Sequence, residues 1–212
     1  MKFVKDLLDK VEPLFSDGGK LEKLHPLFEA TDTILFSTDE RTKTGPHVRD
    51  SIDIKRVMIS VVIALIPCYI FGAYNIGYQR SLTFGEESSV LQNFQIGIIA
   101  LLPILVATFI SGAFWEILFA VLRRHPISEG FLVTCALIPL TLPPSIPLWQ
   151  VVIATSFGIV IGKEIFGGVG MNIFNPALMA RAFLYFTYPI NISGDKVWAL
   201  APDGYSGPTA LS

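Results

Sequence analysis

The stretch VMISVVIALIPCYIFGAYNIGYQ, residues 57–79, decides the fold, because it contains 23 consecutive residues without a charged side chain. A helix that crosses a bilayer needs about 20 mainly apolar residues, so this stretch predicts a membrane-spanning helix. Two longer uncharged stretches follow, with 28 residues at 88–115 and 33 residues at 130–162. The chain is therefore predicted to be an all-α integral membrane protein.

The composition supports this prediction and excludes several other classes. Of the 212 residues, 51% are hydrophobic and 16% are charged, whereas a soluble domain carries about 25% charged residues. The first 56 residues hold 21 of the 34 Lys, Arg, Asp and Glu side chains. A disordered chain and a soluble enzyme are both inconsistent with this pattern. The net charge of −2 and the lack of a basic block also exclude nucleic acid as a partner.

The last uncharged stretch is too long for one helix, and it contains PPSIP at residues 143–147. Proline lacks a backbone donor and ends helices, so two segments are expected to meet at this turn. A broken segment at membrane depth is tolerated where it lines a cavity or packs against protein. About five membrane segments, some of them broken, are expected at 57–78, 94–122, 130–142, 148–165 and 172–190.

Polar regions flank this membrane domain of residues 57–190. Residues 1–56 form a predicted arm, in which apolar residues between 7 and 15 recur at helical spacing and indicate a short amphipathic helix. Lys and Arg in the loops after residue 122 and at 163 place those loops and the arm in the cytoplasm. Five spans then place the tail, residues 191–212, outside the cell.

If the protein performs chemistry, the polar residues inside the apolar domain are the candidates, because such residues are costly in a bilayer. The densest group lies in GKEIFGGVGMNIFNPALMARAFL, residues 162–184. Asn172 and Asn175 are three apart, so a helix would place both amides on one face, where they suit a ring with carbonyl and nitrogen atoms. The alternative is structural: glycines that pack helices together and an internal salt bridge for Arg181.

Two further regions carry candidate groups. Glu129, at the entry to the third segment, is either a cation ligand or proton relay or an ordinary interfacial charge, and Glu116 presents the same choice. The segment DGYSGPTALS, residues 203–212, is typical of an external turn by composition alone. Cys68 and Cys135 lie far apart in apolar runs and indicate buried structural residues. No metal site is expected.

Long segments of the chain resemble the B subunit of the Na+-translocating NADH:quinone oxidoreductase, in the family that also includes the D subunit of the Rnf complex. The resemblance is carried by these strings: HPLFEA (25–30), HVRDSIDIKRVM (47–58), SEGFLVT (128–134), LPPSIPLWQ (142–150), FGIVIGKEIFGGVGMNIFNPALMARAFLYFTYP (157–189), ISGDKVW (192–198) and DGYSGPTALS (203–212). They cover the whole length of the chain. The resemblance implies that this chain is one half of a fold built from two related halves.

The resemblance also implies cofactors and their positions. The family carries FMN joined by a phosphoester to a threonine, which here is Thr209. The motif also includes Asp203, Ser206 and Gly207, and Pro208 stands where the family usually has alanine. A non-covalent riboflavin is implied near Asn172 and Asn175.

The ion and quinone sites are implied in the same way. Glu129 and Gly130 match a segment associated with quinone binding, and Glu29 and Glu129 match acidic positions implicated in sodium uptake.

The function that the resemblance implies is that of one subunit of a Na+-transporting NADH:ubiquinone reductase in the bacterial inner membrane. Electrons would pass from covalent FMN through riboflavin to ubiquinone while sodium is exported. The implied partners are the other subunits, a flavin transferase and membrane lipid. Two alternatives remain open: a subunit of an Rnf-type ferredoxin:NAD+ oxidoreductase, and a channel or transporter half without a redox cofactor.

Overall fold

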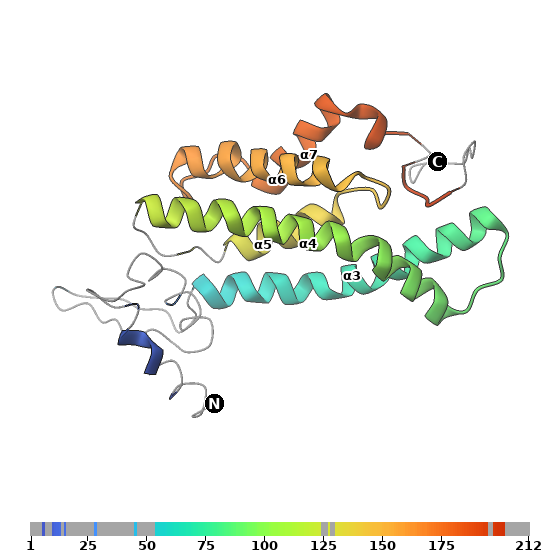
Figure 1. Cartoon of the computed structure of the whole chain (residues 1–212), viewed down its shortest axis with the longest axis horizontal. Coiled ribbons are helices and arrows are strands. Elements are labelled where there is room, and N and C mark those ends of the chain that lie inside the picture. The colour runs from blue at the N-terminus through green and yellow to red at the C-terminus, as the bar shows by residue number, and fades with distance from the viewer. Residues whose placement is uncertain are drawn as a thin grey trace.

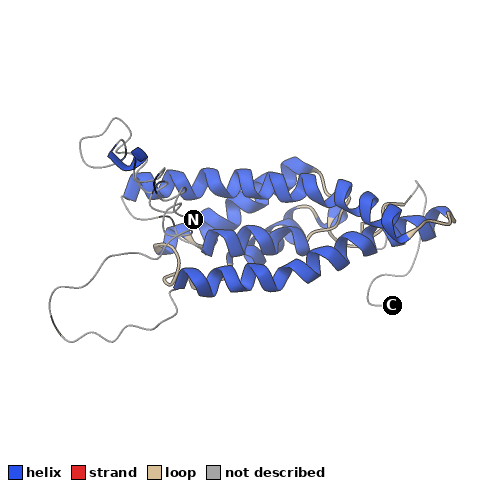
Figure 2. Ribbon diagram, turned by 90° about the horizontal axis from the view of Figure 1, so that it is seen from below, coloured by secondary structure: helices blue, strands red, loops and turns tan. Residues whose placement is uncertain are grey.

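The computed structural model describes residues 54–123, 127, 130–194 and 197–201, and the separate positions 6, 10–13, 15, 28 and 45. All regular structure in these ranges is helical (Figure 2). Three helices, α3 (Ile54–Phe84), α4 (Val90–Arg123) and α6 (Leu148–Gly162), lie alongside one another in an elongated bundle (Figure 1). The prediction of an all-α protein is confirmed for the described part of the chain.

Most of the two polar regions lies outside the described residues. In the predicted amphipathic helix near residues 7–15, residues 10–13 and 15 are helical. The remainder of the arm, apart from the separate positions named above, and the tail from residue 202 onward are not described.

Helices α3 and α4 form an antiparallel hairpin in which the two backbones touch. A Cβ atom on Gly77 would lie 1.9 Å from the carbonyl oxygen of Asn93, and one on Gly97 would lie 1.7 Å from that of Ala73. Small residues are the usual means of close helix approach in membranes. The Asn93 side chain also accepts a hydrogen bond of 2.7 Å from the Ser81 hydroxyl, which joins the helices near their connection.

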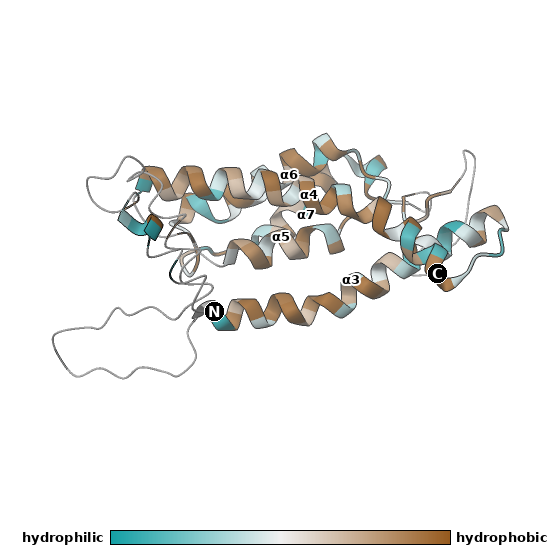
Figure 3. Cartoon of the chain, turned by 60° about the horizontal axis from the view of Figure 1, so that its bottom comes forward, coloured by the Kyte–Doolittle hydropathy of each residue, from teal (hydrophilic) through white to brown (hydrophobic). Residues whose placement is uncertain are grey.

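Three helical stretches are long and apolar enough to cross a membrane: Arg56–Phe84, Val90–Arg123 and Leu148–Phe166. The buried share of their apolar windows rises in that order from 6% through 33% to 50%, so α3 is the outermost helix and α6 the innermost. These helices consist largely of hydrophobic residues (Figure 3), and many of the large hydrophobic side chains are exposed. An apolar surface of this extent is typical of a protein in contact with lipid.

The other two helices are short. Helix α5 (Gly130–Leu140) has 11 residues and α7 (Pro176–Thr187) has 12, which correspond to about 16 and 18 Å at 1.5 Å per residue. Neither reaches across a hydrocarbon layer of about 30 Å. The turn between α5 and α6 contains Pro143 and Pro147, and α6 begins directly after Pro147.

Within the segment predicted at 172–190, the helix is shorter than the segment. Residues 167–175 form a turn, and α7 begins only at Pro176. Gly167, Gly168 and Gly170 in this turn have φ values of 111°, 99° and 89°, which place them in the left-handed region. The chain then continues through the 3₁₀ turn η3 (Pro189–Asn191).

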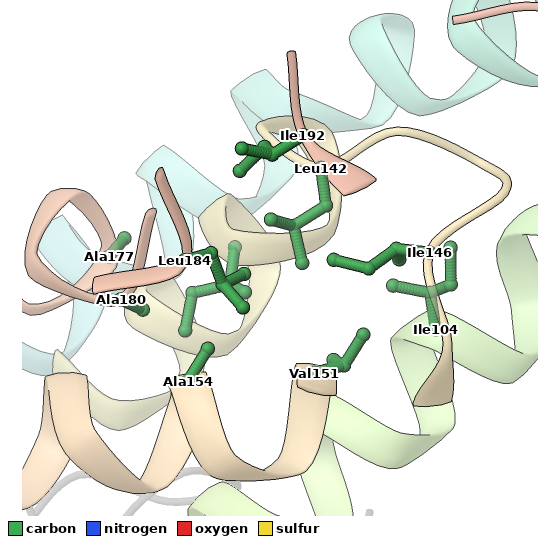
Figure 4. Close-up of a cluster of buried hydrophobic side chains, with 10 residues drawn as sticks. Ile104, Leu142, Ile146, Val151, Ala154, Ala177, Ala180, Leu184 and Ile192 are labelled. Atoms are coloured by element: carbon green, nitrogen blue, oxygen red, sulfur yellow. The ribbon is translucent and has the colours of Figure 1, made fainter. Parts of the chain in front are cut away.

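The hydrophobic core lies where α6, α7 and α4 meet (Figure 4). Small side chains let α6 and α7 approach closely: a Cβ atom on Gly158 would lie 2.9 Å from the Cβ atom of Ala180. Gly162 lies against Pro176, so the two helices run antiparallel. The buried cluster consists of Ile104, Ile138, Leu142, Ile146, Val151, Ala154, Ala177, Ala180, Leu184 and Ile192.

Candidate functional site

A cluster of four charged side chains lies where the C-terminal end of α4 meets the C-terminal end of α6. Glu116 on α4, Lys163 at the end of α6 and Glu164 in the 3₁₀ turn η2 (Glu164–Phe166) are each at most 2% exposed. The Lys163 ammonium forms ion pairs with the Glu116 carboxylate and with Glu164 Oε1, the latter at 3.4 Å. One ammonium group therefore lies between two carboxylates.

Arg123, the last residue of α4, completes this charge cluster. Its Nη1 atom lies 3.2 Å from Glu164 Oε2, and its Nη2 atom donates a hydrogen bond of 2.7 Å to the Glu164 carbonyl oxygen. The guanidinium also lies over the ring of Phe119 at 5.0 Å. Its side chain is 36% exposed, so it covers the buried charges at the outer end of the cluster.

The charge cluster is formally neutral, because it contains two acidic and two basic groups. Removing charges from water costs several kcal/mol for each ion, and this cost is recovered only when the partners are close and well hydrogen-bonded. Loss of one member of such a buried pair typically costs about 3–5 kcal/mol, because the other charge is left unpaired. The cluster therefore ties α4 strongly to the end of α6.

The charge cluster continues directly into the glycine turn. The Lys163 carbonyl oxygen accepts hydrogen bonds of 3.2 Å from the backbone N–H groups of both Phe166 and Gly168. The Glu164 carbonyl oxygen accepts one of 3.0 Å from the Gly167 N–H. The residues that hold the charges thus also determine how the chain leaves α6.

The two predicted asparagines follow in the same turn, but they do not share a helix face. Asn175 is the N-cap of α7, and its Oδ1 atom accepts hydrogen bonds from the N–H groups of Ala177 at 2.9 Å and Leu178 at 3.4 Å. Asn172 precedes the helix, and its Nδ2 atom donates a hydrogen bond of 2.8 Å to the Phe174 carbonyl oxygen. The expected shared face is wrong because Asn175 and Pro176 together begin a helix at this point.

The same hydrogen bonds show what the two amides still offer to a ligand. The Oδ1 atom of Asn172 accepts a hydrogen bond of 3.2 Å from the Gly170 N–H, so both amide oxygens are engaged. Each amide retains N–H donor capacity, because an amide nitrogen carries two hydrogens. Phe174 and Met171 are exposed beside them. Donors beside an apolar surface fit the carbonyl and nitrogen atoms of a flat aromatic ring system such as a flavin.

Of the remaining predicted site residues, Gly130 lies in the described part of the chain. Gly130 is the first residue of α5, and its carbonyl oxygen accepts a hydrogen bond of 2.9 Å from the Thr134 hydroxyl. Since α5 starts soon after α4 ends, Gly130 lies at the same end of the bundle as the charge cluster. Outside the described residues lie Glu29, Glu129, Asp203, Ser206, Gly207 and Thr209.

Two other expectations concern a metal site and a salt bridge of Arg181. Within the described ranges, no three His, Cys, Asp or Glu side chains gather so that they could hold a metal ion. The internal salt bridge considered for Arg181 is not formed with any described residue.

Sequence reasoning missed the charge cluster as a unit. The sequence leaves Glu116 open as a cation ligand, a proton relay or an interfacial charge and predicts Lys163 as a loop cation, whereas the two are buried and paired across 47 residues. The available signal was the presence of both signs of charge within otherwise apolar stretches, since intramembrane charges usually pair with one another.

The fold and this site define a multi-pass membrane protein with a buried charge cluster and a polar turn at one end of its bundle. The model of the NQR2, RnfD, RnfE family matches residues 41–212. The chain belongs to this family.

Its relatives include the B subunits of Na(+)-translocating NADH-quinone reductase from Chromohalobacter salexigens, Stutzerimonas stutzeri and Pseudomonas paraeruginosa, to which it is 49%, 49% and 47% identical. Each match covers 99% of this chain, but only 56%, 57% and 57% of the respective relative. The chain thus spans little more than half the length of these relatives.

Proposed function

We propose that the chain is a flavin-bearing membrane part of a sodium-translocating NADH:quinone oxidoreductase. The observation that carries this proposal is the 49% identity, over 99% of the chain, to the B subunit from Chromohalobacter salexigens. In this role the chain does not bind NADH itself. It receives electrons that enter through other subunits and delivers them to ubiquinone, coupled to sodium export across the bacterial inner membrane.

Thr209 is the proposed attachment point of a covalent FMN. Its hydroxyl oxygen would form the phosphoester, and the small neighbours Ser206 and Gly207 leave room for a bulky ring and its phosphate. Asp203 belongs to the same motif. A flavin transferase is the partner that this modification requires. The bound flavin would supply the electron-transfer chemistry.

Asn172 and Asn175 are the proposed contacts for the non-covalent riboflavin. The free N–H groups of their amides support this role, because they can donate to ring carbonyl and nitrogen atoms. The charge cluster would keep the turn in position through the backbone hydrogen bonds of Lys163 and Glu164. The chain's own contribution is therefore to orient the ring beside apolar side chains that exclude water.

The quinone and sodium sites are proposed at the same end of the bundle. Gly130 begins α5 there, and Glu129 precedes it in the sequence. Glu129 and Gly130 are the proposed quinone contacts, and Glu29 and Glu129 are the proposed acidic groups for sodium entry. A carboxylate at the membrane surface attracts a monovalent cation and supplies the oxygen ligands that it prefers.

The proposed orientation places this end in the cytoplasm and the tail in the periplasm. Because α3 and α4 are antiparallel, Arg56 near the start of α3 and Arg123 at the end of α4 lie at the same end. The positive-inside rule favours the cytoplasm for such an end. Lys163 contributes less to this argument than its sequence position implied, because it is buried in ion pairs.

A component of an Rnf-type ferredoxin:NAD+ oxidoreductase is the second candidate, because the matching family model also covers RnfD and RnfE. The quinone-reducing complex is favoured over the Rnf complex, because the relatives that match 99% of this chain are named as subunits of NADH-quinone reductase. Sodium-stimulated quinone reduction by the assembled complex separates the two. A channel or transporter half without a redox cofactor would show no fluorescence in a denaturing gel, whereas covalently bound flavin would.

The experiment that tests the flavin proposal is intact-mass measurement of the chain co-expressed with its flavin transferase. The wild type is expected to carry one FMN less one water. Thr209→Ala removes the only side-chain oxygen and is expected to lose the added mass and the gel fluorescence, while Thr209→Ser keeps a hydroxyl and retains part of it. A modified Thr209→Ala chain would place the attachment elsewhere, with Ser206 as the next residue to test.

A further inference from the structure

Arg123 is the residue through which the end of α4 reaches the chain that follows α6. Its Nη2 atom donates a hydrogen bond of 2.7 Å to the Glu164 carbonyl oxygen, and its Nη1 atom lies 3.2 Å from Glu164 Oε2. One guanidinium thus contacts both the backbone and the carboxylate of the same residue. A lysine, with one compact ammonium group, does not reproduce this planar two-point contact.

The carbonyl group that receives this bond supports the turn at residues 167–175, which we call the asparagine turn. The Glu164 carbonyl oxygen also accepts a hydrogen bond of 3.0 Å from the Gly167 N–H. At the two ends of the turn, the rings of Phe166 and Phe174 meet edge to face with their centroids 6.1 Å apart. The contact from α4 is therefore made at the base of a closed turn.

The backbone of the asparagine turn requires such support from outside. Gly167, Gly168 and Gly170 all have positive φ values, and glycine has more accessible conformations than any other residue. The Gly170 N–H donates a hydrogen bond of 3.2 Å to Asn172 Oδ1, so the position of this amide depends on the conformation of the glycines. A ligand binds more tightly when the groups that contact it are held in place beforehand.

Stability of the fold alone does not explain the contact made by Arg123. Its side chain is partly exposed, unlike that of Glu164, and ion pairs near the surface contribute little to the free energy of unfolding. What the guanidinium adds is a defined geometry, since it is held over the ring of Phe119 on one side and bonded to Glu164 on the other.

We propose that Arg123 is a positioning residue for the non-covalent flavin. From the end of α4 it holds the Glu164 carbonyl group, and with it the asparagine turn, in the conformation that presents the amides of Asn172 and Asn175. This inference rests on the proposed function, in which these two amides bind the flavin. Arg123 acts through Glu164 and does not contact the ring. Loss of its two-point contact loosens the turn and weakens flavin binding, while the bundle stays folded.

The first test is Arg123→Lys, which keeps the charge but loses the two-point contact. The matched control is Arg80→Lys at the opposite end of the bundle, because Arg80 also lies over a phenylalanine ring, that of Phe84 at 5.1 Å. Equilibrium dialysis of riboflavin against the flavin-depleted complex measures the dissociation constant, and thermal unfolding in detergent measures stability. We expect Arg123→Lys to raise the dissociation constant about tenfold, because a hydrogen bond of an ionised group is lost from the support of the turn. We expect its unfolding midpoint to stay unchanged, and Arg80→Lys to change neither quantity.

A second measurement reports the turn without any flavin. Val169 is 40% exposed in the turn, so Val169→Cys in a background without Cys68 and Cys135 accepts a nitroxide spin label. We expect the electron paramagnetic resonance spectrum of the flavin-depleted complex to show a more mobile label in Arg123→Lys. Arg80→Lys is expected to leave the spectrum unchanged.

Asn175→Asp separates the failure of this inference from the failure of the proposed function. Loss of flavin from Asn175→Asp but not from Arg123→Lys would overturn the role of Arg123 and leave the flavin site in place. Full flavin retention in both variants would overturn the flavin site and this inference with it. Equal weakening in Arg80→Lys, a lower unfolding midpoint alongside flavin loss in Arg123→Lys, or an unchanged label spectrum would also overturn the positioning role.

Discussion

At the scale of single residues, the buried charges at the end of α6 are the most costly feature of the described molecule. A hydrophobic cluster of similar volume is often as stable as a buried ion pair, or more stable. Burial of Glu116, Lys163 and Glu164 is therefore not explained by stability alone. Their backbone and side-chain bonds connect α4 to the asparagine turn, which is a structural reason to keep charges there.

Removal of one charge from this cluster is expected to be more damaging than removal of two. Lys163→Met leaves two buried carboxylates without their shared cation and is expected to lower stability by about 3–5 kcal/mol. The double variant Glu116→Leu/Lys163→Met restores neutrality and is expected to recover most of this loss. Thermal unfolding in detergent measures both. Glu87→Gln, at an exposed position, is the control and is expected to stay within about 0.5 kcal/mol. Additive losses in the double variant would contradict the pairing.

Asn175 allows its capping role and its proposed flavin contact to be separated. Asn175→Asp keeps the oxygen that caps α7, and a negative charge is favourable at a helix N-terminus, but it removes the N–H donors. Asn175→Ala removes both and is expected to cost about 1 kcal/mol. We expect both variants to lose non-covalent flavin, measured after extraction from the purified complex, but only Asn175→Ala to lose stability. Full flavin retention in Asn175→Asp would leave only the structural role.

At the scale of elements, the glycines that join α3 to α4 make a direct prediction. Gly77→Ala places a methyl group against the Asn93 carbonyl, so the hairpin must open, at an expected cost of about 1–3 kcal/mol. Gly72→Ala, on the same helix, meets no atom within 4 Å, and alanine is the better helix former there. Unfolding in detergent is expected to show a lower midpoint for Gly77→Ala and an equal or higher one for Gly72→Ala. Equal effects would show that close backbone contact is unimportant.

The elements also show which features could be predicted from the sequence. Charge-free runs and the prolines at 143–147 were enough to predict membrane helices with a break, because both signals are local. The start of α7 had a local signal too, asparagine followed by proline, which was outweighed by the apolar run around it. The pairing of Glu116 with Lys163 could not be predicted in this way, since it depends on how two helices pack across 47 residues.

At the scale of the whole molecule, one end of the bundle gathers most of the proposed chemistry. The charge cluster, the asparagine turn and Gly130 all lie where α4 and α6 end and α5 begins. The Glu164–Arg123 contact joins the end of α4 to the turn after α6 at this same end. The connection between α3 and α4, with the exposed Glu86 and Glu87, lies at the opposite end. The orientation of the molecule therefore decides on which side of the membrane the asparagine turn lies.

Cysteine labelling can determine this orientation. In a background without Cys68 and Cys135, Val169→Cys places a thiol in the exposed glycine turn, and Glu87→Cys places one in the α3–α4 connection. The two positions lie at opposite ends of α4, which is long enough to cross the membrane. A membrane-impermeant maleimide is expected to label Val169→Cys only in inverted vesicles, where the cytoplasmic side faces the reagent. It is expected to label Glu87→Cys only in intact spheroplasts, where the periplasmic side faces the reagent. The reverse pattern would place the asparagine turn in the periplasm and rule out cytoplasmic sodium entry beside it. Labelling of both positions from one side would show that α4 does not span the membrane.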